Sequence, residues 1–339
     1  MSVNSFSGMA AVPTSYGFTA GKNKIINGDF GVWQRGTSFS ITANSTYTSD
    51  RFLVAYSTAA PTSWTISQQT FTPGTAPVAG YEGQYFFRSQ MTTIGTATFP
   101  SMRQRIEDVR TFAGRSVTVS FWAKADTTRT VTSALTQVFG TGGSTAVTAL
   151  DGGSLSLTTS WTRFSYTGSI PSISGKTIGT NGYLQFAITL PAENATIDIW
   201  GVQIEYGSTA TPFQTATGTI QGELAACQRY YQRFNASSVY TFFCNGNAYS
   251  TTQATTILPL PVTLRTAPSS IETTGTASNY RLTNGASATA CNSVPALDQA
   301  ATQSLAINFY VASGLTAGQA INAGANNTAS AYIGVSAEL

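Results

Sequence analysis

The 339-residue sequence contains no histidine and only 14 acidic residues. Without histidine, the chain lacks the commonest general base, the Ser–His and Cys–His nucleophile pairs, and the ligand of most zinc sites. A glycosidase would need two carboxyl groups about 5 to 10 Å apart. The neighbours Glu107 and Asp108 alternate in direction along a strand or turn, and nothing marks a longer-range pair such as Glu82 with Glu205. We therefore expect a protein that is not an enzyme.

Charge is also scarce. Asp, Glu, Lys and Arg make up 9% of the chain, whereas they make up about 25% of typical soluble domains. The net charge is +3 and no basic run is present, so we expect no nucleic-acid partner. Thr, Ser, Ala, Gly, Asn and Gln replace the missing charged residues. This composition favours a stable extracellular or particle-bound β protein over a cytosolic metabolic enzyme.

Cysteines and long apolar runs are likewise few. Cys227, Cys244 and Cys291 are too scattered for a disulfide framework, and their odd number predicts free, buried thiols made in a reducing compartment. No run of about 18 apolar residues occurs, so we expect no membrane insertion. The first residues lack the basic start and apolar core of a signal peptide, which predicts synthesis in a cytoplasm.

What the chain does contain is β-strand patterning. Val117, Val119 and Phe121 alternate with polar residues, and so do Leu184 and Phe186. Glycine- and proline-rich breakers separate such segments at the spacing of a β-sandwich. No alternating strand–helix unit is present, which argues against a parallel α/β sheet. The pattern predicts two-layer antiparallel packing.

The same strand signals return near the end of the chain. We therefore predict an all-β fold with two antiparallel, jelly-roll-like β-sandwich domains joined by one short amphipathic helix. The predicted parts are an N-terminal arm over residues 1–22, a first sandwich over 23–214, a helical neck over 215–235 and a C-terminal sandwich over 236–339.

One segment has helical periodicity. In residues 219–234, TIQGELAACQRYYQRF, apolar positions are separated by 4, 3, 4 and 3 residues, as in a coiled-coil seam. So short a helix is marginal in water, so its apolar stripe must pack against something. Either the β domains cover the stripe, or the same helix from sister chains does, which would give a trimeric neck. The stripe residues are Ile220, Leu224, Cys227, Tyr231 and Phe234.

Several strings of the sequence resemble, in this order, parts of one family. The strings are KNKIINGDFGVW at residues 22–33, GRSVTVSFWAKA at 114–125, IDIWGVQIEYGSTATPF at 197–213, ELAACQRYYQRF at 223–234, PLPVTLRTAPS at 259–269 and AYIGVSAEL at 331–339. The first three resemble jelly-roll carbohydrate-binding modules as they occur in bacteriophage tail-fibre and related virion proteins. The fourth resembles the helix that follows such modules, and the last two resemble the C-terminal β domain found after it.

The resemblance implies a virion appendage that is usually trimeric. We therefore expect a homotrimer on the virion surface, synthesised in the host bacterial cytoplasm. Its arm, residues 1–22, would attach to other virion proteins, and its sandwiches would contact host cell-surface glycans. Two alternatives remain open. One is a capsid decoration or head-fibre protein with little glycan binding, and the other is a polysaccharide-degrading tail spike.

The alternation of side-chain direction along each strand predicts which residues could bind glycan. If Val119 faces the core, Trp122 stands on the outer face of its strand, and by the same rule Tyr183 and Gln185 point outward. Aromatic rings beside amides and hydroxyls suit sugars, and the modules that the sequence resembles bind glycans on the outer, concave face of one sheet. Trp64 lies in an alternating strand and can point either way. Alternatively, a loop, the neighbouring domain or a sister chain covers the outward aromatics.

A structural calcium ion is the one cofactor to consider. The resembled modules often hold calcium near their first and last strands, and Asp29 and Asp198 occupy matching positions. Calcium needs six to eight oxygen ligands, and these are the two acidic groups that the sequence offers. The alternative is that each is a surface or hydrogen-bonded aspartate.

Overall fold

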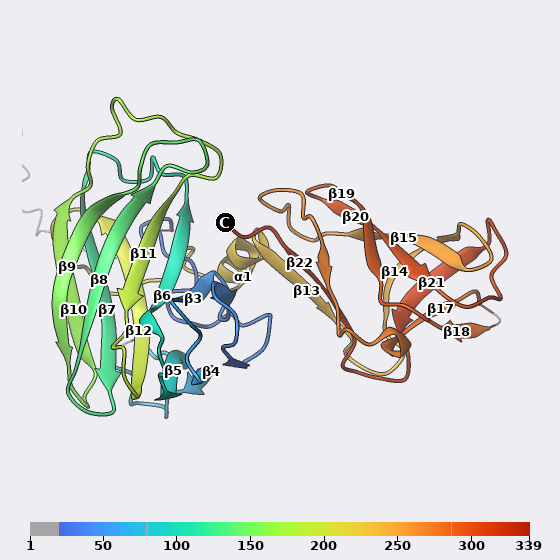
Figure 1. Ribbon diagram of the computed structural model, residues 1–339, viewed down its shortest axis with the longest axis horizontal. Helices are drawn as coiled ribbons and strands as arrows, with labels where there is room; N and C mark the ends of the chain where they lie inside the picture. The colour runs from blue at the N-terminus through green and yellow to red at the C-terminus, as the bar shows by residue number, and fades with distance from the viewer. Residues whose placement is uncertain (1–19, 79–80, 286) are drawn as a thin grey trace, which may run out of the picture.

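The computed structural model describes residues 20–78, 81–285 and 287–339, and over these ranges it is almost entirely β (Figure 1). Two β-sandwiches lie next to one another along the longest axis, with the α-helix of the described chain at their boundary. The predicted all-β fold class, with two sandwiches and one short helix, is confirmed. Within the described residues, no helix is long and apolar enough to cross a membrane.

Two six-stranded antiparallel sheets form the first sandwich. Sheet A contains, in spatial order, β1 (Ser38–Ser40), β4 (Ser63–Thr70), β5 (Tyr85–Thr93), β12 (Ala195–Tyr206), β7 (Ser116–Ala125) and β10 (Thr162–Ser169). Sheet B contains, in spatial order, β2 (Thr46–Tyr47), β3 (Phe52–Ser57), β6 (Thr98–Glu107), β11 (Tyr183–Thr189), β8 (Arg129–Val138) and β9 (Val147–Leu157).

The core of this sandwich lies between the two sheets. Alternate residues of each strand point inward, so that Phe121 of β7 meets Phe186 of β11 with ring centroids 6.4 Å apart. Ile199 of β12 and Phe52 of β3 are fully buried in the same cluster. The predicted alternation around Val119 and Leu184 therefore describes these strands correctly.

The second sandwich pairs a three-stranded sheet with a seven-stranded sheet. The smaller sheet contains β13 (Tyr231–Asn235), β22 (Tyr332–Ser336) and β16 (Ile271–Glu272). The larger contains β18 (Ala288–Ala290), β17 (Tyr280–Thr283), β21 (Ala320–Ala325), β14 (Phe242–Ala248), β15 (Gln253–Pro259), β20 (Ser304–Tyr310) and β19 (Ala296–Ala300). A 3₁₀ turn at Ala277–Asn279 precedes β17.

The α-helix is shorter than predicted. Helix α1 spans Ile220–Gln228 and is capped by Thr219, whose side chain accepts a hydrogen bond from the N–H of Gly222. Tyr231 and Phe234 lie in β13, which pairs with β22 from the far end of the chain. The long-range pairing with β22 thus overrides the helical pattern of the local sequence. The predicted neck region is therefore part helix and part strand.

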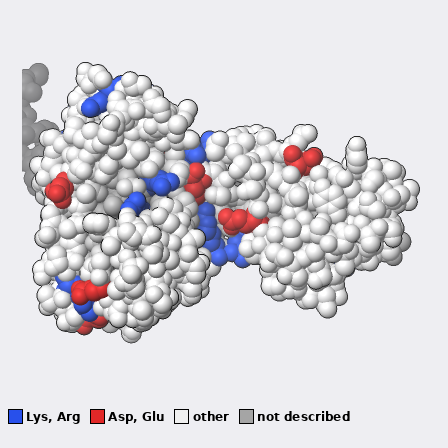
Figure 2. Space-filling model, viewed as in Figure 1, with Lys and Arg blue, Asp and Glu red and all other residues white. Residues whose placement is uncertain are grey.

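Ion pairs and cation–π contacts join the two sandwiches. Arg229 donates to both carboxylate oxygens of Glu107 at 2.9 and 3.0 Å, and the Tyr230 hydroxyl donates to the same carboxylate at 2.9 Å. Arg35 lies 3.5 Å from the ring centre of Tyr231. Figure 2 shows basic and acidic side chains gathered at this boundary, whereas most of the visible C-terminal sandwich carries no charge.

Candidate functional site

Trp122 stands on the outer face of its strand, as predicted, but it is buried. Its side chain packs on Trp200 with ring centroids 5.4 Å apart, and the guanidinium of Arg163 lies 4.6 Å over its ring. Phe71 and Phe213 belong to the same aromatic cluster, which leaves Trp122 only 7% exposed. The prediction that Trp122 contacts glycan is therefore wrong, because side chains from flanking segments cover it.

Two glycines allow the chain to lie directly on these indole rings. A Cβ atom at Gly83 would stand 2.9 Å from the Trp200 ring, and one at Gly201 would stand 2.7 Å from the Trp122 ring. Gly201 also has φ of +66° at an irregularity in the pairing of β12 with β7. Close approach of backbone to ring at these two positions explains how the outer face of sheet A becomes a second core.

Trp64 is also a core residue. It is 2% exposed in the main cluster of the first sandwich, and its indole N–H donates to the Ser89 hydroxyl at 2.8 Å. Trp64 points to the inner side of β4, so its ring is shielded from solvent. Trp64 is therefore not a glycan contact, which corrects that prediction.

Tyr183 and Gln185 point outward from β11, as predicted, and both are half-buried. However, β11 lies in sheet B, whereas β7 with Trp122 lies in sheet A. The predicted residues therefore stand on opposite faces of the sandwich and cannot form one site. Strand phase is readable from the sequence, but the assignment of each strand to a sheet is a long-range property.

Tyr183 and Gln185 belong to a polar surface of their own. Gln185 is the register partner of Arg105 on β6 and Thr136 on β8, and the next outward residue, Ala187, pairs with Arg103 and Ala134. We call this surface the sheet B face. It consists of Arg103, Arg105, Thr132, Ala134, Thr136, Tyr183, Gln185 and Ala187.

The two arginines of the sheet B face are held in place. The guanidinium of Arg105 lies 5.1 Å from the ring centre of Tyr183, and Arg103 donates to the Ser101 hydroxyl at 2.9 Å. Burial and the neighbouring charge of Arg105 lower the pKa of Arg103. The C-terminal sandwich borders the face, since Arg105 also donates to the main-chain oxygen of Leu339. The face is therefore bounded along its β6 side.

The apolar stripe of the predicted neck is divided. Cys227 and Tyr231 are fully buried inside the chain, and Phe234 packs against the core of the second sandwich. Ile220 and Leu224 are 85% and 38% exposed. The prediction of one intermolecular seam is therefore wrong, because the chain's own β domains cover three of the five residues.

Asp198 is not a calcium ligand. Arg88 donates to its two oxygens at 2.7 and 2.8 Å, and the ammonium of Lys124 lies 3.6 Å away. Two cations thus already neutralise this carboxylate. Among residues 20–78, 81–285 and 287–339, no group of three or more His, Cys, Asp or Glu side chains is placed to hold a metal ion. Asp198 is therefore a hydrogen-bonded aspartate, which is the alternative interpretation given above.

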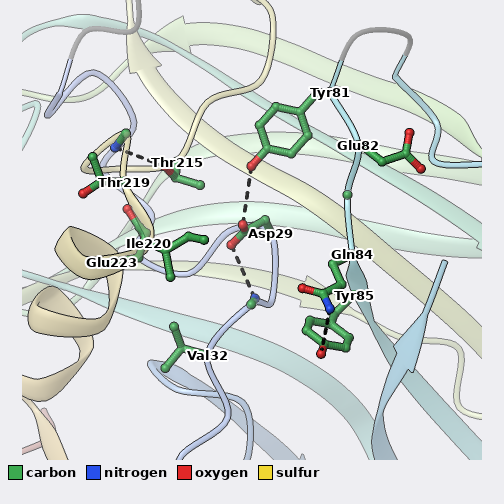
Figure 3. A pocket seen from close by; sticks show the side chains of 13 residues that line it. Asp29, Val32, Tyr81, Glu82, Gln84, Tyr85, Thr215, Thr219, Ile220 and Glu223 are labelled. Carbon is green, nitrogen blue, oxygen red and sulfur yellow. Dashed lines mark hydrogen bonds between the residues drawn. The ribbon is translucent and has the colours of Figure 1, made fainter. Parts of the chain in front are cut away.

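Asp29 lines a pocket of about 270 Å³ (Figure 3). The pocket lies where the turn at Asp29, the segment 81–85 and the beginning of α1 meet. Figure 3 shows the Tyr81 hydroxyl directed at the Asp29 carboxylate, with Gln84 and Tyr85 across from them. Burial and the nearby charge of Glu223 raise the pKa of Asp29 to about 6.

Glu223 supports this pocket from the helix. Its carboxylate accepts from the N–H of Asn27 at 2.8 Å and from the N–H and hydroxyl of Thr217 at 2.7 and 2.9 Å. These bonds tie the turn before Asp29 to the first turn of α1. The pocket was not predicted from the sequence, although the turn residues NGDF and the aromatic residues of segment 81–85 both line or border it.

The three cysteines are free and buried, as predicted. Burial raises the pKa of Cys244 to about 11 and that of Cys291 to about 12. Burial also raises the pKa of Cys227, which lies on the buried side of helix α1. Each thiol therefore stays protonated at neutral pH.

No protein-family model matches the sequence, and no curated protein matches it. Solved structures do show similarity in fold. A structure described as a CBM4 carbohydrate-binding module is 20% identical, with a TM-score of 0.32, over 53% of this chain and 98% of that chain. The CBM22-2 xylan-binding domain of Paenibacillus barcinonensis Xyn10C is 13% identical, with a TM-score of 0.32, over 54% of this chain and 97% of that one. The enzymatically active domain of tailspike protein 4 of bacteriophage CBA120 is 17% identical, with a TM-score of 0.34, over 55% of this chain and 22% of that one.

Proposed function

We propose that this chain is a non-enzymatic appendage protein of a bacteriophage particle, and that its first sandwich binds host-surface glycans on the sheet B face. The observation that carries the proposal is the outward row of Arg105, Gln185 and Thr136 on three adjacent strands. This row presents a guanidinium, an amide and a hydroxyl side by side. Such fixed hydrogen-bonding groups suit the hydroxyls of a sugar.

The neighbouring rows complete a surface of the right chemistry. Tyr183 offers a half-buried ring for the C–H face of a sugar, and Arg105 next to it limits the ring's motion. Ala187 and Ala134 keep the middle of the face free of long side chains. A shallow face of this kind buries little of a ligand, so affinity per domain is low and multivalent display adds strongly to it.

Attachment and assembly belong to the same proposal. The arm, residues 1–22, attaches the chain to other virion proteins; residues 1–19 of it lie outside the described ranges. The assembled form is a homotrimer. Support for self-association comes from the exposed Phe242 and Ile257 on the seven-stranded sheet, in a domain of low charge.

Glycan binding is tested with Gln185→Ala in the full chain. Its matched control is Gln90→Ala, an exposed glutamine on sheet A. We expect Gln185→Ala to weaken binding to purified host surface polysaccharide, measured by calorimetry, by about tenfold, because a buried sugar hydroxyl loses its partner. Equal binding by the two variants would refute a role for the sheet B face. Release of reducing sugar by the unmodified chain would instead favour the tail-spike alternative.

The trimer is tested by light scattering on the unmodified chain. Ile257→Lys should lower the measured mass towards that of a monomer, because it places three ammonium groups in an apolar contact. Gln299→Lys, on exposed β19 of the same sheet, is the control. A monomeric unmodified chain would contradict the proposal.

A further inference from the structure

We propose that the pocket at Asp29 is a second binding site, which takes a single neutral sugar residue. It is separate from the sheet B face, because segment 81–85 packs on the aromatic cluster over sheet A, whereas the sheet B face lies on the other sheet. The inference goes beyond the proposed function and does not depend on it.

The hydrogen bonds that the Asp29 carboxylate accepts within the described chain are long. Its two carboxylate oxygens accept from the Gly31 N–H and the Tyr81 hydroxyl, each at 3.4 Å. Hydrogen bonds of these types are usually about 2.7 to 3.2 Å long. The carboxylate thus retains acceptor capacity on the side that faces the pocket. A sugar hydroxyl placed there would donate a charge-assisted hydrogen bond.

Both apolar and neutral polar groups surround Asp29 in the pocket. Tyr85 and Ile220 give the pocket apolar surface, while Gln84 and the hydroxyl of Thr219 give it neutral polar groups. Gln84 donates to the Tyr85 hydroxyl at 3.0 Å, which orients the amide (Figure 3). A sugar ring has the matching pattern of apolar C–H faces and hydroxyl edges.

The charge of the pocket lining favours a neutral ligand. The described lining contains three carboxylates, on Asp29, Glu82 and Glu223, and neither Lys nor Arg. An anionic sugar such as a uronic acid would be repelled. A calcium ion, which needs six to eight oxygens, would have to compete for occupied groups. Both oxygens of Glu223 accept hydrogen bonds from Asn27 and Thr217, and Glu82 accepts from the Gly74 N–H at 2.6 Å.

The size of the pocket limits the ligand to one ring. Its volume is about 270 Å³, whereas pockets for drug-sized ligands span about 300 to 1,000 Å³. A terminal residue of a glycan fits this description better than an internal stretch of polysaccharide. The pocket therefore recognises a chain end, while an extended face suits a chain interior.

The test uses the full chain and simple probes. Methyl glucoside, methyl galactoside and N-acetylglucosamine are titrated separately and followed by saturation-transfer NMR, with glucuronate as the anionic comparison. We expect at least one neutral probe to bind in the millimolar range and glucuronate not to bind. Asp29→Asn should weaken binding about tenfold, because the acceptor loses its charge.

A blocking variant separates loss of the site from loss of the fold. Ile220→Trp fills the pocket from its rim, and since Ile220 is 85% exposed, the change removes no buried contact. Leu224→Trp is the matched control, one helical turn further on and outside the lining. Binding should disappear in Ile220→Trp, persist in Leu224→Trp, and persist in Gln185→Ala of the sheet B face.

Four outcomes would overturn the inference. The first is that no neutral probe binds at tens of millimolar. The second is that Ile220→Trp and Leu224→Trp bind equally, which would place the site elsewhere. The third is that calcium chloride alone binds and that Asp29→Asn abolishes this, which would make the pocket a cation site. The fourth is release of reducing sugar from an oligosaccharide in a manner that requires Asp29 and Glu223, which would make the pocket catalytic.

Discussion

Arg51 and Glu338 are 287 residues apart in the sequence and form a buried ion pair at the boundary between the two sandwiches. The side chain of Arg51 is 1% exposed, and its guanidinium also lies 3.4 Å from the ring centre of Tyr230. Glu338 accepts a second contact from Arg35 at 3.5 Å. The segment that follows β22 is thereby bound to the first sandwich.

Removal of one charge from this pair should be costly. We expect Glu338→Gln to lower the free energy of unfolding by about 3 to 5 kcal/mol, because Arg51 would remain buried without its counter-charge. Denaturant titration of the full chain measures the change. Glu193→Gln is the control, since the Glu193 side chain, which pairs with Arg129, is 53% exposed and surface pairs contribute about 0 to 1 kcal/mol. Equal losses in the two variants would contradict the special role of the boundary pair.

Trp122→Ala should behave as a core mutation. Its aromatic neighbours Trp200 and Phe213 would border a cavity, so we expect a loss of about 3 to 5 kcal/mol of stability. Binding of glycan by the folded fraction should be unchanged, because Trp122 is only 7% exposed and lies on the sheet opposite the sheet B face. Urea denaturation and calorimetry on the same preparation check both statements. A stable variant with reduced glycan binding would show that the aromatic cluster opens to ligand.

The Asp29 carboxyl predicts a specific pH dependence of stability. Its folded-state pKa is about 6 against an ordinary value of 3.8, so the folded chain binds its proton more tightly than the unfolded chain. The resulting stabilisation is present below about pH 4 and is lost as the pH rises through 6. Asp29→Asn, which cannot ionise, should therefore be more stable than the unmodified chain at pH 7.5 by about 1 to 2 kcal/mol.

The advantage of Asp29→Asn should shrink as the pH falls towards 4. Thermal unfolding of both proteins across this range measures the difference, and Asp298→Asn at an exposed position of β19 serves as the control. A pH-independent difference would show that Asp29 does not titrate near 6.

The thiols should be unreactive in the folded protein. Burial raises the pKa of Cys244 to about 11 and that of Cys291 to about 12, and Cys227 is fully buried. Alkylation at pH 8 should therefore modify none of them under native conditions and all three after denaturation, because the thiolate is the reactive form. Mass spectrometry counts the adducts. Rapid modification of Cys227 in the native state would show that α1 separates from the β domains.

The local sequence pattern predicted those structural properties that depend on neighbouring residues, such as the direction of side chains along a strand. The alternation of Val117, Val119 and Phe121 correctly placed Trp122 on the opposite side of β7. The alternation of Leu184 and Phe186 correctly predicted which residues of β11 point into the core. The local pattern gave a wrong prediction for Tyr231 and Phe234. Their spacing is helical, but both residues lie in β13, which pairs with β22. Hydrogen bonds to a distant strand outweigh the small preferences of a short helix.

The sequence by itself determined the all-β class, the short helix between the two sandwiches, the direction in which the residues of β7 and β11 point, and the state of the three cysteines. Only the tertiary structure decided that β7 and β11 belong to different sheets, which separates Trp122 from Tyr183. It also decided that Asp29, Tyr81 and Glu223 share one pocket. The physical reason is that side-chain direction follows from a period of two along one strand, whereas sheet order and pockets depend on contacts between residues tens to hundreds of positions apart.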